Sequence, residues 1–233
     1  MTIDLIRARR FSRRLRAWFK RHGRDLPWRY TRDPYRILVS ELMLQQTQAA
    51  RVVDFYERFL DRFPDMGTLA AAKPQMVREA WHGLGYYARA RNLHTLAQTV
   101  AENGGQIPDE PNELLELPGV GPYTAHAVAT FAYERRSAPV DTNVARVIAR
   151  AFAPRLKPKR ARDLTQLRRL AQQILPRTGK AAWAHNQGLM ELGALVCTAR
   201  VAKCGDCPVR RDCETGQSSE LKAQRERRPL RAL

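Results

Sequence analysis

The sequence predicts an all-α protein, and three observations support that prediction. Apolar residues recur at helical spacing rather than in the alternation that is typical of strands. Turn signals rich in proline, glycine, asparagine and aspartate separate the apolar stretches. Segments with strand character are nearly absent. We therefore expect a series of short helices joined by short links.

The helical segments follow one another along the chain. Apolar stripes lie over residues 52–63, over residues 128–152 with a break at 137–139, and over residues 164–175. The sequence turns polar and basic after Cys213, and residues 214–233 are expected to form a flexible tail.

The chain is strongly basic. It has 233 residues, of which 41 are Lys or Arg and 23 are Asp or Glu, giving a formal net charge of +18. Such an excess favours a polyanionic partner, most simply nucleic acid. A basic soluble protein without such a partner is the alternative.

The N-terminal segment is neither a signal peptide nor a membrane anchor by composition. Nine Lys or Arg residues lie between Arg7 and Arg24, with no long apolar core. No run of about 18 apolar residues occurs in the sequence, so no spanning helix is predicted. We expect no membrane partner and a cytoplasmic, nucleoid-associated location.

The segment LPGVGPYTAHAVATF contains Gly119 and Gly121, and Asp141 follows about 20 residues later. This spacing is similar to the dinucleotide-binding fingerprint of Rossmann folds. That fingerprint requires a strand before the first glycine, whereas residues 112–117 have the composition of a helix. A nicotinamide enzyme is therefore disfavoured.

The same glycines fit a hairpin of two helices. The first helix is expected to end at 114–117, and Pro122 stands where proline favours the start of the second. Gly119 and Gly121 can adopt positive φ and leave backbone N–H groups uncovered. Such groups at a helix N-terminus suit a phosphate oxygen and read the DNA backbone rather than its bases. An ordinary helix–helix turn is the alternative, and the basic charge favours nucleic acid.

All four cysteines lie within seventeen residues, Cys197, Cys204, Cys207 and Cys213, with the spacing C-x6-C-x2-C-x5-C. In a cytosolic chain such a cluster indicates a metal site rather than disulfides. Zinc sites usually show two short C-x2-4-C pairs, and only one is present here. The spacing favours a [4Fe–4S] cluster, with zinc as the alternative.

Two acidic residues are candidates for chemistry. Glu41, in ILVSELMLQQTQ, has Leu38 and Leu44 as helical neighbours, and partial desolvation would raise its pKa and suit it to donate a proton. Asp141 stands at the expected N-cap of a helix that starts near Thr142. The alternatives are a hydrogen-bonded, half-buried acid and a simple cap.

Together, the glycine hairpin, Asp141 and the cysteine spacing resemble the helix-hairpin-helix–GPD superfamily of DNA glycosylases, from about Leu26 to Cys213. Within it, LPWR, DPYRILVSELMLQQTQ, GLGYYARARNLH and ELGALVC are most similar to the MutY branch. Members of that branch remove adenine mispaired with guanine or 8-oxoguanine.

The resemblance implies the helix-hairpin-helix DNA glycosylase fold, with a six-helix barrel domain beside an iron–sulfur cluster domain and DNA in the cleft between them. The basic N-terminal segment, 1–28, would pack with the cluster domain at 136–213. The barrel would occupy 29–135 and contain the hairpin at 114–130.

The resemblance also implies roles for individual residues. Glu41 would be the general acid, Asp141 would stabilise the positively charged sugar beside Asn143, and Tyr123 takes the position of the lysine in lyase-competent relatives such as endonuclease III. The residues expected to contact DNA are Gln46 and Tyr86 as wedges in the base stack, Gly119 and Gly121 at the phosphate, and Trp28, Arg29, Thr47 and Gln187 near the base pocket. The four cysteines would hold the [4Fe–4S] cluster.

The activity implied is that of a monofunctional adenine glycosylase, a monomer acting on duplex DNA with a mispaired or damaged base. Two features depart from the MutY pattern. The chain ends about 20 residues after Cys213, so we expect the domain that reads 8-oxoguanine, and with it the preference for that base, to be missing. Asp141 lies in DTN, where many MutY proteins have DGN.

Three other activities stay open. The nearest is a thymine or uracil glycosylase at mispairs with guanine, and the second is a glycosylase with strand-cleaving lyase activity. The third is a non-catalytic, redox-sensing DNA-binding protein, and the presence of both Glu41 and Asp141 argues against it.

Overall fold

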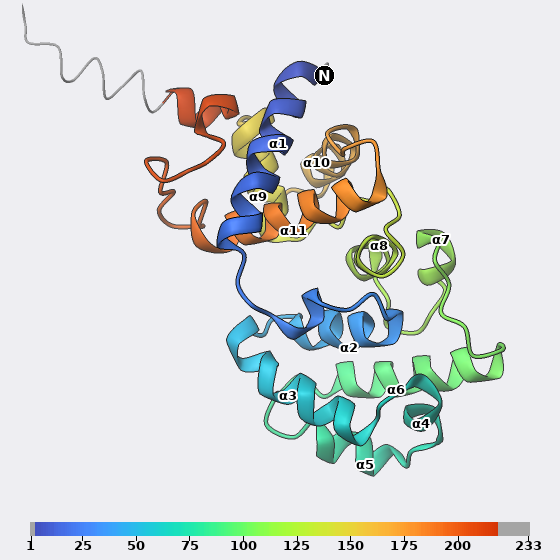
Figure 1. The fold of residues 1–233 in the computed structure, drawn as a ribbon. Helices are drawn as coiled ribbons and strands as arrows, with labels where there is room; N and C mark the ends of the chain where they lie inside the picture. The colour runs from blue at the N-terminus through green and yellow to red at the C-terminus, as the bar shows by residue number, and fades with distance from the viewer. Residues whose placement is uncertain (1–2, 219–233) are drawn as a thin grey trace, which may run out of the picture. The chain divides into compact units, whose positions relative to one another are not determined.

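The computed structural model describes residues 3–218, and it is all-helical as the sequence predicts. Over that range the only β-type pairing is an isolated antiparallel bridge between Cys197 and Ala202. The chain divides into two compact units, Asp25–Pro139 and the combination of Met1–Arg24 with Val140–Leu233 (Figure 1). None of the described helices is both long and apolar enough to cross a membrane.

The unit Asp25–Pro139 is built around a buried helix. Its elements are η1 (Pro27–Arg29), α2 (Pro34–Leu44), α3 (Ala49–Arg62), α4 (Met66–Ala71), α5 (Pro74–Ala80), α6 (Ala88–Glu102), α7 (Pro111–Leu114) and α8 (Pro122–Phe131). Helix α2 contacts α3, α6 and α8, and eight of its eleven residues are buried. Asp33 caps its N-terminus by accepting hydrogen bonds from the backbone N–H groups of Tyr35 and Arg36.

The expected apolar stripe over 52–63 is confirmed as the inner face of α3. Val52, Phe59 and Phe63 are fully or almost fully buried, and the Phe59 ring packs edge-on against the buried Trp81 at 5.7 Å between centroids. Aromatic pairs in this arrangement add to the free energy gained from burying their area. The helix ends at Arg62, just before Phe63 and Pro64, since proline disfavours helical conformation in the residue before it.

The first helix of the hairpin ends within the expected range 114–117, at its first residue, and residues 115–117 are turns rather than helix. Pro111 stands in the first turn of α7, which ends at Leu114, and residues 115–119 form turns. Because Gly119 adopts φ 76, the chain reverses within these few residues, which leaves no length for further helix. Helix α8 then begins at Pro122, as expected.

The second unit consists of the two chain segments on either side of Asp25–Pro139. Its described elements are α1 (Leu5–His22), α9 (Thr142–Phe152), α10 (Ala161–Gln173), α11 (Gly179–Leu195) and η2 (Arg210–Asp212). Helix α11 packs against α1 and α9, and α9 packs against α10. Gly188 permits the close approach of α1, because a Cβ atom there would lie 2.9 Å from Leu15 Cγ.

Ion pairs join α1 to the segment that carries the cysteines. Asp212 is buried and accepts hydrogen bonds from Arg10 Nε at 3.0 Å and Arg14 Nη1 at 2.8 Å. Arg7 pairs with Glu214 at 2.9 Å. The basic N-terminal segment therefore neutralises carboxylates of its own unit with part of its charge.

Arg89, in the first turn of α6, fixes the C-terminal end of α2. Its Nη1 atom donates to the carbonyl oxygens of Leu42 (2.9 Å), Met43 (2.7 Å) and Gln45 (2.6 Å), and its Nη2 atom donates to Gly85 O at 3.1 Å. The residue is buried, and that burial lowers the pKa of its guanidinium from the usual value. A cation at these carbonyls satisfies helix-end acceptors and interacts favourably with the negative end of the helix dipole.

Replacing Arg89 by Met should lower the free energy of unfolding by at least about 2 kcal/mol, because several buried carbonyls lose a charged donor. Arg91→Met is the matched control, since Arg91 is exposed two residues further along α6 and should change stability by less than about 0.5 kcal/mol. Urea unfolding followed by circular dichroism measures both. Equal midpoints for the two variants would contradict the role given to Arg89.

Candidate functional site

Glu41 lies in the middle of α2, the most buried helix of its unit. The residue is 5% exposed, and its neighbours Leu38 and Leu42 are almost completely buried. One turn further along, Gln45 donates from Nε2 to Thr124 Oγ1 in α8 at 3.5 Å. Glu41 is therefore a carboxyl group in largely apolar surroundings, on the helix that packs against the helix bearing Tyr123.

The turn after α2 brings three predicted DNA-contacting residues together around Arg89. Gln46 is exposed with φ 58, and Tyr86 is 57% exposed with φ 49. The Arg89 guanidinium lies 5.2 Å from the Tyr86 ring centroid and donates to Thr47 Oγ1 at 3.3 Å. Gln46 and Tyr86 thus have exposed side chains. One buried cation, Arg89, binds both neighbours of Gln46 and lies against the Tyr86 ring.

The glycine hairpin differs from the expectation at one of its two glycines. Gly119 has φ 76, but Gly121 has φ −92 and ψ 174, which is extended backbone that any residue adopts. Gly121 is the N-cap of α8, and a Cβ atom there would meet nothing within 4 Å. At Gly119 a Cβ atom would lie 2.5 Å from Asn92 Cβ, so the hairpin tip packs directly against α6. The first turn of α8 follows with Tyr123, which is half-buried.

In the other unit, Asp141 is the N-cap of α9 and has a fixed orientation. Its Oδ1 accepts from Val144 N at 2.6 Å, and its Oδ2 accepts from Asn143 Nδ2 at 3.1 Å. Asn143 Oδ1 in turn accepts from Arg146 Nη2 at 2.8 Å. Gly193 allows α11 to approach, because a Cβ atom at that position would lie 2.8 Å from Asn143 Cβ.

The same network reaches the cysteine segment. Arg146 donates to Gly193 O and to Cys197 O, both at 2.8 Å. One turn later, Arg150 donates to Cys197 Sγ at 3.3 Å and to Thr198 O at 2.8 Å. The orientation of Asp141 is thereby tied through Asn143 and Arg146 to the backbone of the first cysteine.

The four cysteines line one pocket, together with Arg150 and Lys203. Burial raises the pKa of the Cys207 thiol to about 12, with a further contribution from the neighbouring sulfurs, and burial also raises the pKa of Cys213. As the side chains stand in residues 3–218, no group of three or more His, Cys, Asp or Glu side chains is placed to hold a metal ion. Arg150 Nη1 and the Gly216 N–H, at 3.4 Å from Cys213 Sγ, are donors to these sulfurs.

The remaining predicted residues lie in different places. Trp28 is buried and packs edge-on against Tyr56 at 5.5 Å between centroids, whereas Arg29 beside it is half-buried. Gln187 is buried within α11 of the other unit. Neither Trp28 nor Gln187 presents a largely exposed surface within its own unit.

The sequence interpretation missed the arginines that position these groups. Arg89 lies in the first turn of a helix, where a cation opposes the helix dipole, and that position could have indicated a partner outside α6. Arg146 and Arg150 are four residues apart in an otherwise apolar helix and therefore share one face. That face meets the cysteine segment.

A model of one protein family matches residues 39–173, more than half of the chain, and its description is "HhH-GPD superfamily base excision DNA repair protein". The matched range includes Glu41 and the part of α2 from Val39 onward, the hairpin, and α9 with its N-cap Asp141. The superfamily expected from the hairpin, the aspartate and the cysteines is confirmed.

Relatives and a solved structure agree with this match. The chain is 46% identical to the Mycobacterium tuberculosis adenine DNA glycosylase over 200 aligned residues. The alignment covers 84% of this chain and 64% of the relative. It is 37% identical to the Aeropyrum pernix thymine-DNA glycosylase, covering 91% of this chain and 96% of the relative. A thermostable thymine-DNA glycosylase structure has a TM-score of 0.82 at 31% identity and covers 91% of this chain and 98% of its own.

The chain spans from 41% to 66% of the length of the curated adenine DNA glycosylases that it matches. The family match, by contrast, includes both candidate acids, Glu41 and Asp141. By that match and these similarities, the chain belongs to the HhH-GPD superfamily of base excision DNA repair proteins.

Proposed function

We propose that this protein is a monofunctional DNA glycosylase that hydrolyses the N-glycosidic bond of adenine mispaired with guanine or 8-oxoguanine. The observation that carries the choice of base is Glu41, a carboxyl group that is 5% exposed in an apolar helix. The adenine DNA glycosylases among the relatives support the same choice.

Adenine leaves easily only when its ring is protonated, so its removal requires a general acid. Apolar surroundings disfavour the charged form of a carboxyl group and so favour the protonated acid that can donate. Glu41 is proposed to donate that proton to the adenine ring and afterwards to accept one from the attacking water.

Cleavage of the bond leaves positive charge on the sugar, and Asp141 is proposed to stabilise it. A carboxylate that already has a fixed orientation does not need to reorganise as the charge develops. Val144 N and Asn143 Nδ2 fix that orientation, and Arg146 fixes Asn143. One protonated and one ionised acid is the division of roles found at other sites that cleave glycosidic bonds.

We propose that the enzyme lacks lyase activity because residue 123 is a tyrosine. Strand cleavage through a Schiff base requires an amine, and position 123 offers a phenol. Water is then the nucleophile, and the product is an intact abasic site.

The partner is duplex DNA with a base flipped out of the stack. Removing a base from the duplex costs a few kcal/mol, and an inserted aromatic side chain recovers about 1–3 kcal/mol by stacking. The side chains of Tyr86 and Gln46 are exposed and are suited to fill the vacated space. The turn at Gly119 and the first N–H groups of α8 are proposed to bind a backbone phosphate. We expect the protein to act as a monomer in the DNA-containing compartment, associated with the nucleoid.

The four cysteines are proposed to hold a [4Fe–4S] cluster. They fit such a group in three respects: all four line one pocket, thiolates are the usual ligands, and Arg150 and Gly216 donate hydrogen bonds to two of the sulfurs. The cluster would cross-link the segment 197–213, whose Asp212 already pairs with α1. Its contribution in this proposal is structural.

A thymine or uracil glycosylase at mispairs with guanine is the second candidate. The observation that favours it is the similarity to the Aeropyrum pernix protein, of which the chain covers 96%. Thymine and uracil leave as stabilised anions and depend less on a general acid. The dependence of base release on Glu41 therefore distinguishes the two activities.

Glu41→Gln should reduce release of adenine from an A·G duplex by between about 10²-fold and 10⁴-fold, because the amide cannot donate the required proton. Single-turnover release of the base, revealed by alkali cleavage at the abasic site, measures this. Parallel duplexes with A·8-oxoguanine, T·G and U·G serve as controls. Rapid release of thymine or uracil by both proteins, with A·G untouched, would instead establish the second candidate.

Asp141→Asn should reduce base release by about 10²-fold to 10³-fold while DNA affinity and stability change little. Asparagine keeps the capping oxygen and the size of the side chain but removes the negative charge that would stabilise the positively charged sugar. Asp33→Asn is the matched control, since Asp33 caps α2 in the same way and should leave release unchanged. Equal rates for the two variants would reduce Asp141 to a helix cap.

The protein purified without oxygen should be yellow-brown and contain about four irons per chain. Cys207→Ser should lose that colour and most of the iron, because one ligand is removed from the set. Visible absorbance and metal analysis on the same sample test both statements. Colourless wild-type protein with stoichiometric zinc would show that the site is a zinc site.

A further inference from the structure

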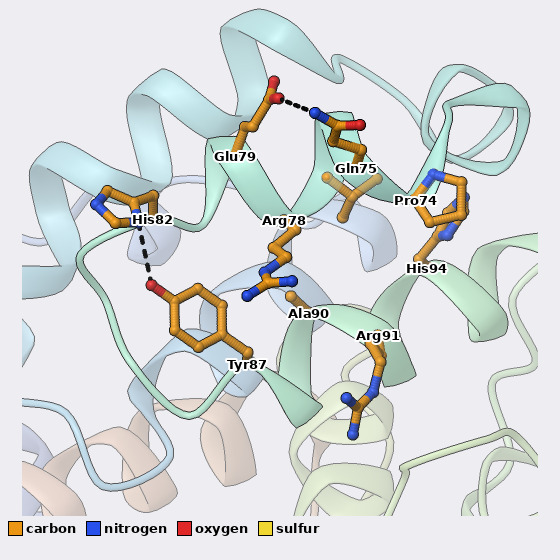
Figure 2. Close-up of a pocket in the computed structure, with 10 residues that line it drawn as sticks. Pro74, Gln75, Arg78, Glu79, His82, Tyr87, Ala90, Arg91 and His94 are labelled. Carbon is orange, nitrogen blue, oxygen red and sulfur yellow. Dashed lines mark hydrogen bonds between the residues drawn. The ribbon is translucent and has the colours of Figure 1, made fainter.

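A pocket lies between α5 and α6, next to the loop that presents Tyr86 (Figure 2). The polar and charged side chains that line it include Arg78, His82, Tyr87, Arg91 and His94. The proposed roles above use none of these residues. The pocket lies wholly within the unit Asp25–Pro139.

The two arginines of this pocket carry charge that nearby carboxylates do not neutralise. Among the described residues no carboxylate oxygen lies within 4 Å of the side-chain nitrogens of Arg78 or Arg91, whereas Arg62, Arg135 and Arg24 each have such a partner. The Arg78 guanidinium lies 5.6 Å from the Tyr87 ring centroid. Stacking on an aromatic face holds a guanidinium in place while leaving its N–H donors available.

Glu79, the acidic residue that lines the pocket, interacts with residues other than Arg78 and Arg91. Glu79 accepts from Gln75 Nε2 at 3.0 Å and lies 3.5 Å from Arg62 Nη2. Figure 2 shows Glu79 reaching toward Gln75 while Arg78 extends away from them toward Ala90. The part of the pocket between Arg78 and Arg91 is therefore positively charged.

A buried histidine also lines this pocket. His94 is 5% exposed, and its Nε2 atom has no hydrogen-bond partner within the part of the chain that the structure describes. Nearly all buried polar atoms in proteins have a partner, so such an atom calls for a bound group or a water. His82, at the outer rim, has its Nδ1 atom 3.2 Å from the Tyr87 hydroxyl.

The position of Arg91 connects the pocket to the hairpin. Asn92, the next residue, contacts the hairpin tip, since a Cβ atom on Gly119 would lie 2.5 Å from Asn92 Cβ. At the other end, Tyr87 follows Tyr86, the exposed residue proposed as the wedge. Arg91 is thus adjacent in the chain to a residue that contacts the hairpin, and Arg78 lies over the ring of the residue that follows Tyr86.

We propose that Arg78 and Arg91 form a second phosphate site, which binds a backbone phosphate of the DNA beyond the nucleotides held by the Gly119 turn and Tyr86. Guanidinium groups match phosphate oxygens in geometry and charge. The site reads the backbone and not the sequence, so it adds affinity to every duplex. This inference rests on the proposed function only in requiring that the protein binds DNA.

The test is the salt dependence of binding to an undamaged duplex, for Arg78→Gln, Arg91→Gln and the double variant. Each lost phosphate contact should reduce the slope of log K against log salt by about 1, and the double variant should lose about 2. Arg169→Gln is the matched control, since Arg169 is exposed on α10 and has no ion pair in the described part of the chain. Its slope should equal that of the wild type. Circular dichroism melting should show the same fold for all variants.

A double variant whose slope equals that of Arg169→Gln would overturn the proposal. A free nucleotide is the other source of phosphate, so calorimetric titration with AMP at constant ionic strength is the second arm. The proposal would also be overturned if the wild type bound AMP and the double variant did not, while the salt dependence of DNA binding was the same for both. Absence of base release with normal DNA binding would refute the proposed activity and leave this inference standing.

Discussion

The part of the unit Asp25–Pro139 that carries the proposed site residues depends on one guanidinium, that of Arg89. It closes the C-terminal end of α2 through the carbonyls of Leu42, Met43 and Gln45. It also lies over the Tyr86 ring and binds the Thr47 hydroxyl. The proton donor proposed at Glu41 lies one turn before this helix end, so a single buried cation contacts both the end of that helix and Tyr86, a proposed wedge residue. A guanidinium suits this task because its planar donors reach several carbonyl oxygens at once.

The unit that carries the cysteines uses arginine in a related way. Arg146 and Arg150 extend from one face of α9 to the backbone and sulfur of Cys197. Arg146 also holds Asn143, which holds Asp141. Asp141, the proposed catalytic aspartate, and Cys197, a proposed metal ligand, are therefore parts of one hydrogen-bonded network. A change in the cysteine segment would be transmitted to the orientation of that carboxylate through two side chains.

Much of the fold follows from local sequence rules. The stripe on α3, the proline start of α8 and the Asp141 cap are consequences of periodicity and end chemistry, and each could be predicted. Residues 115–117 were expected to be helical but form turns, and the reversal that follows at Gly119 packs against Asn92, a contact distant in sequence. The candidate acids could be found as residue types in a motif. The arginines that orient them were missed, because most of their partners are backbone carbonyl groups, which every residue possesses and no sequence pattern distinguishes.

The left-handed backbone at Gln46 and Tyr86 has a consequence for engineering this protein. Residues other than glycine pay on the order of 1 kcal/mol or more to adopt positive φ, and both positions here carry large side chains. Glycine at either position would relieve local strain in the native state, although it would also loosen the unfolded chain. Stability-driven redesign would therefore tend to remove the two side chains that are proposed to enter a DNA duplex. Screens for thermostable variants of this chain need to retain selection for DNA repair, since heat resistance alone offers no reason to keep them.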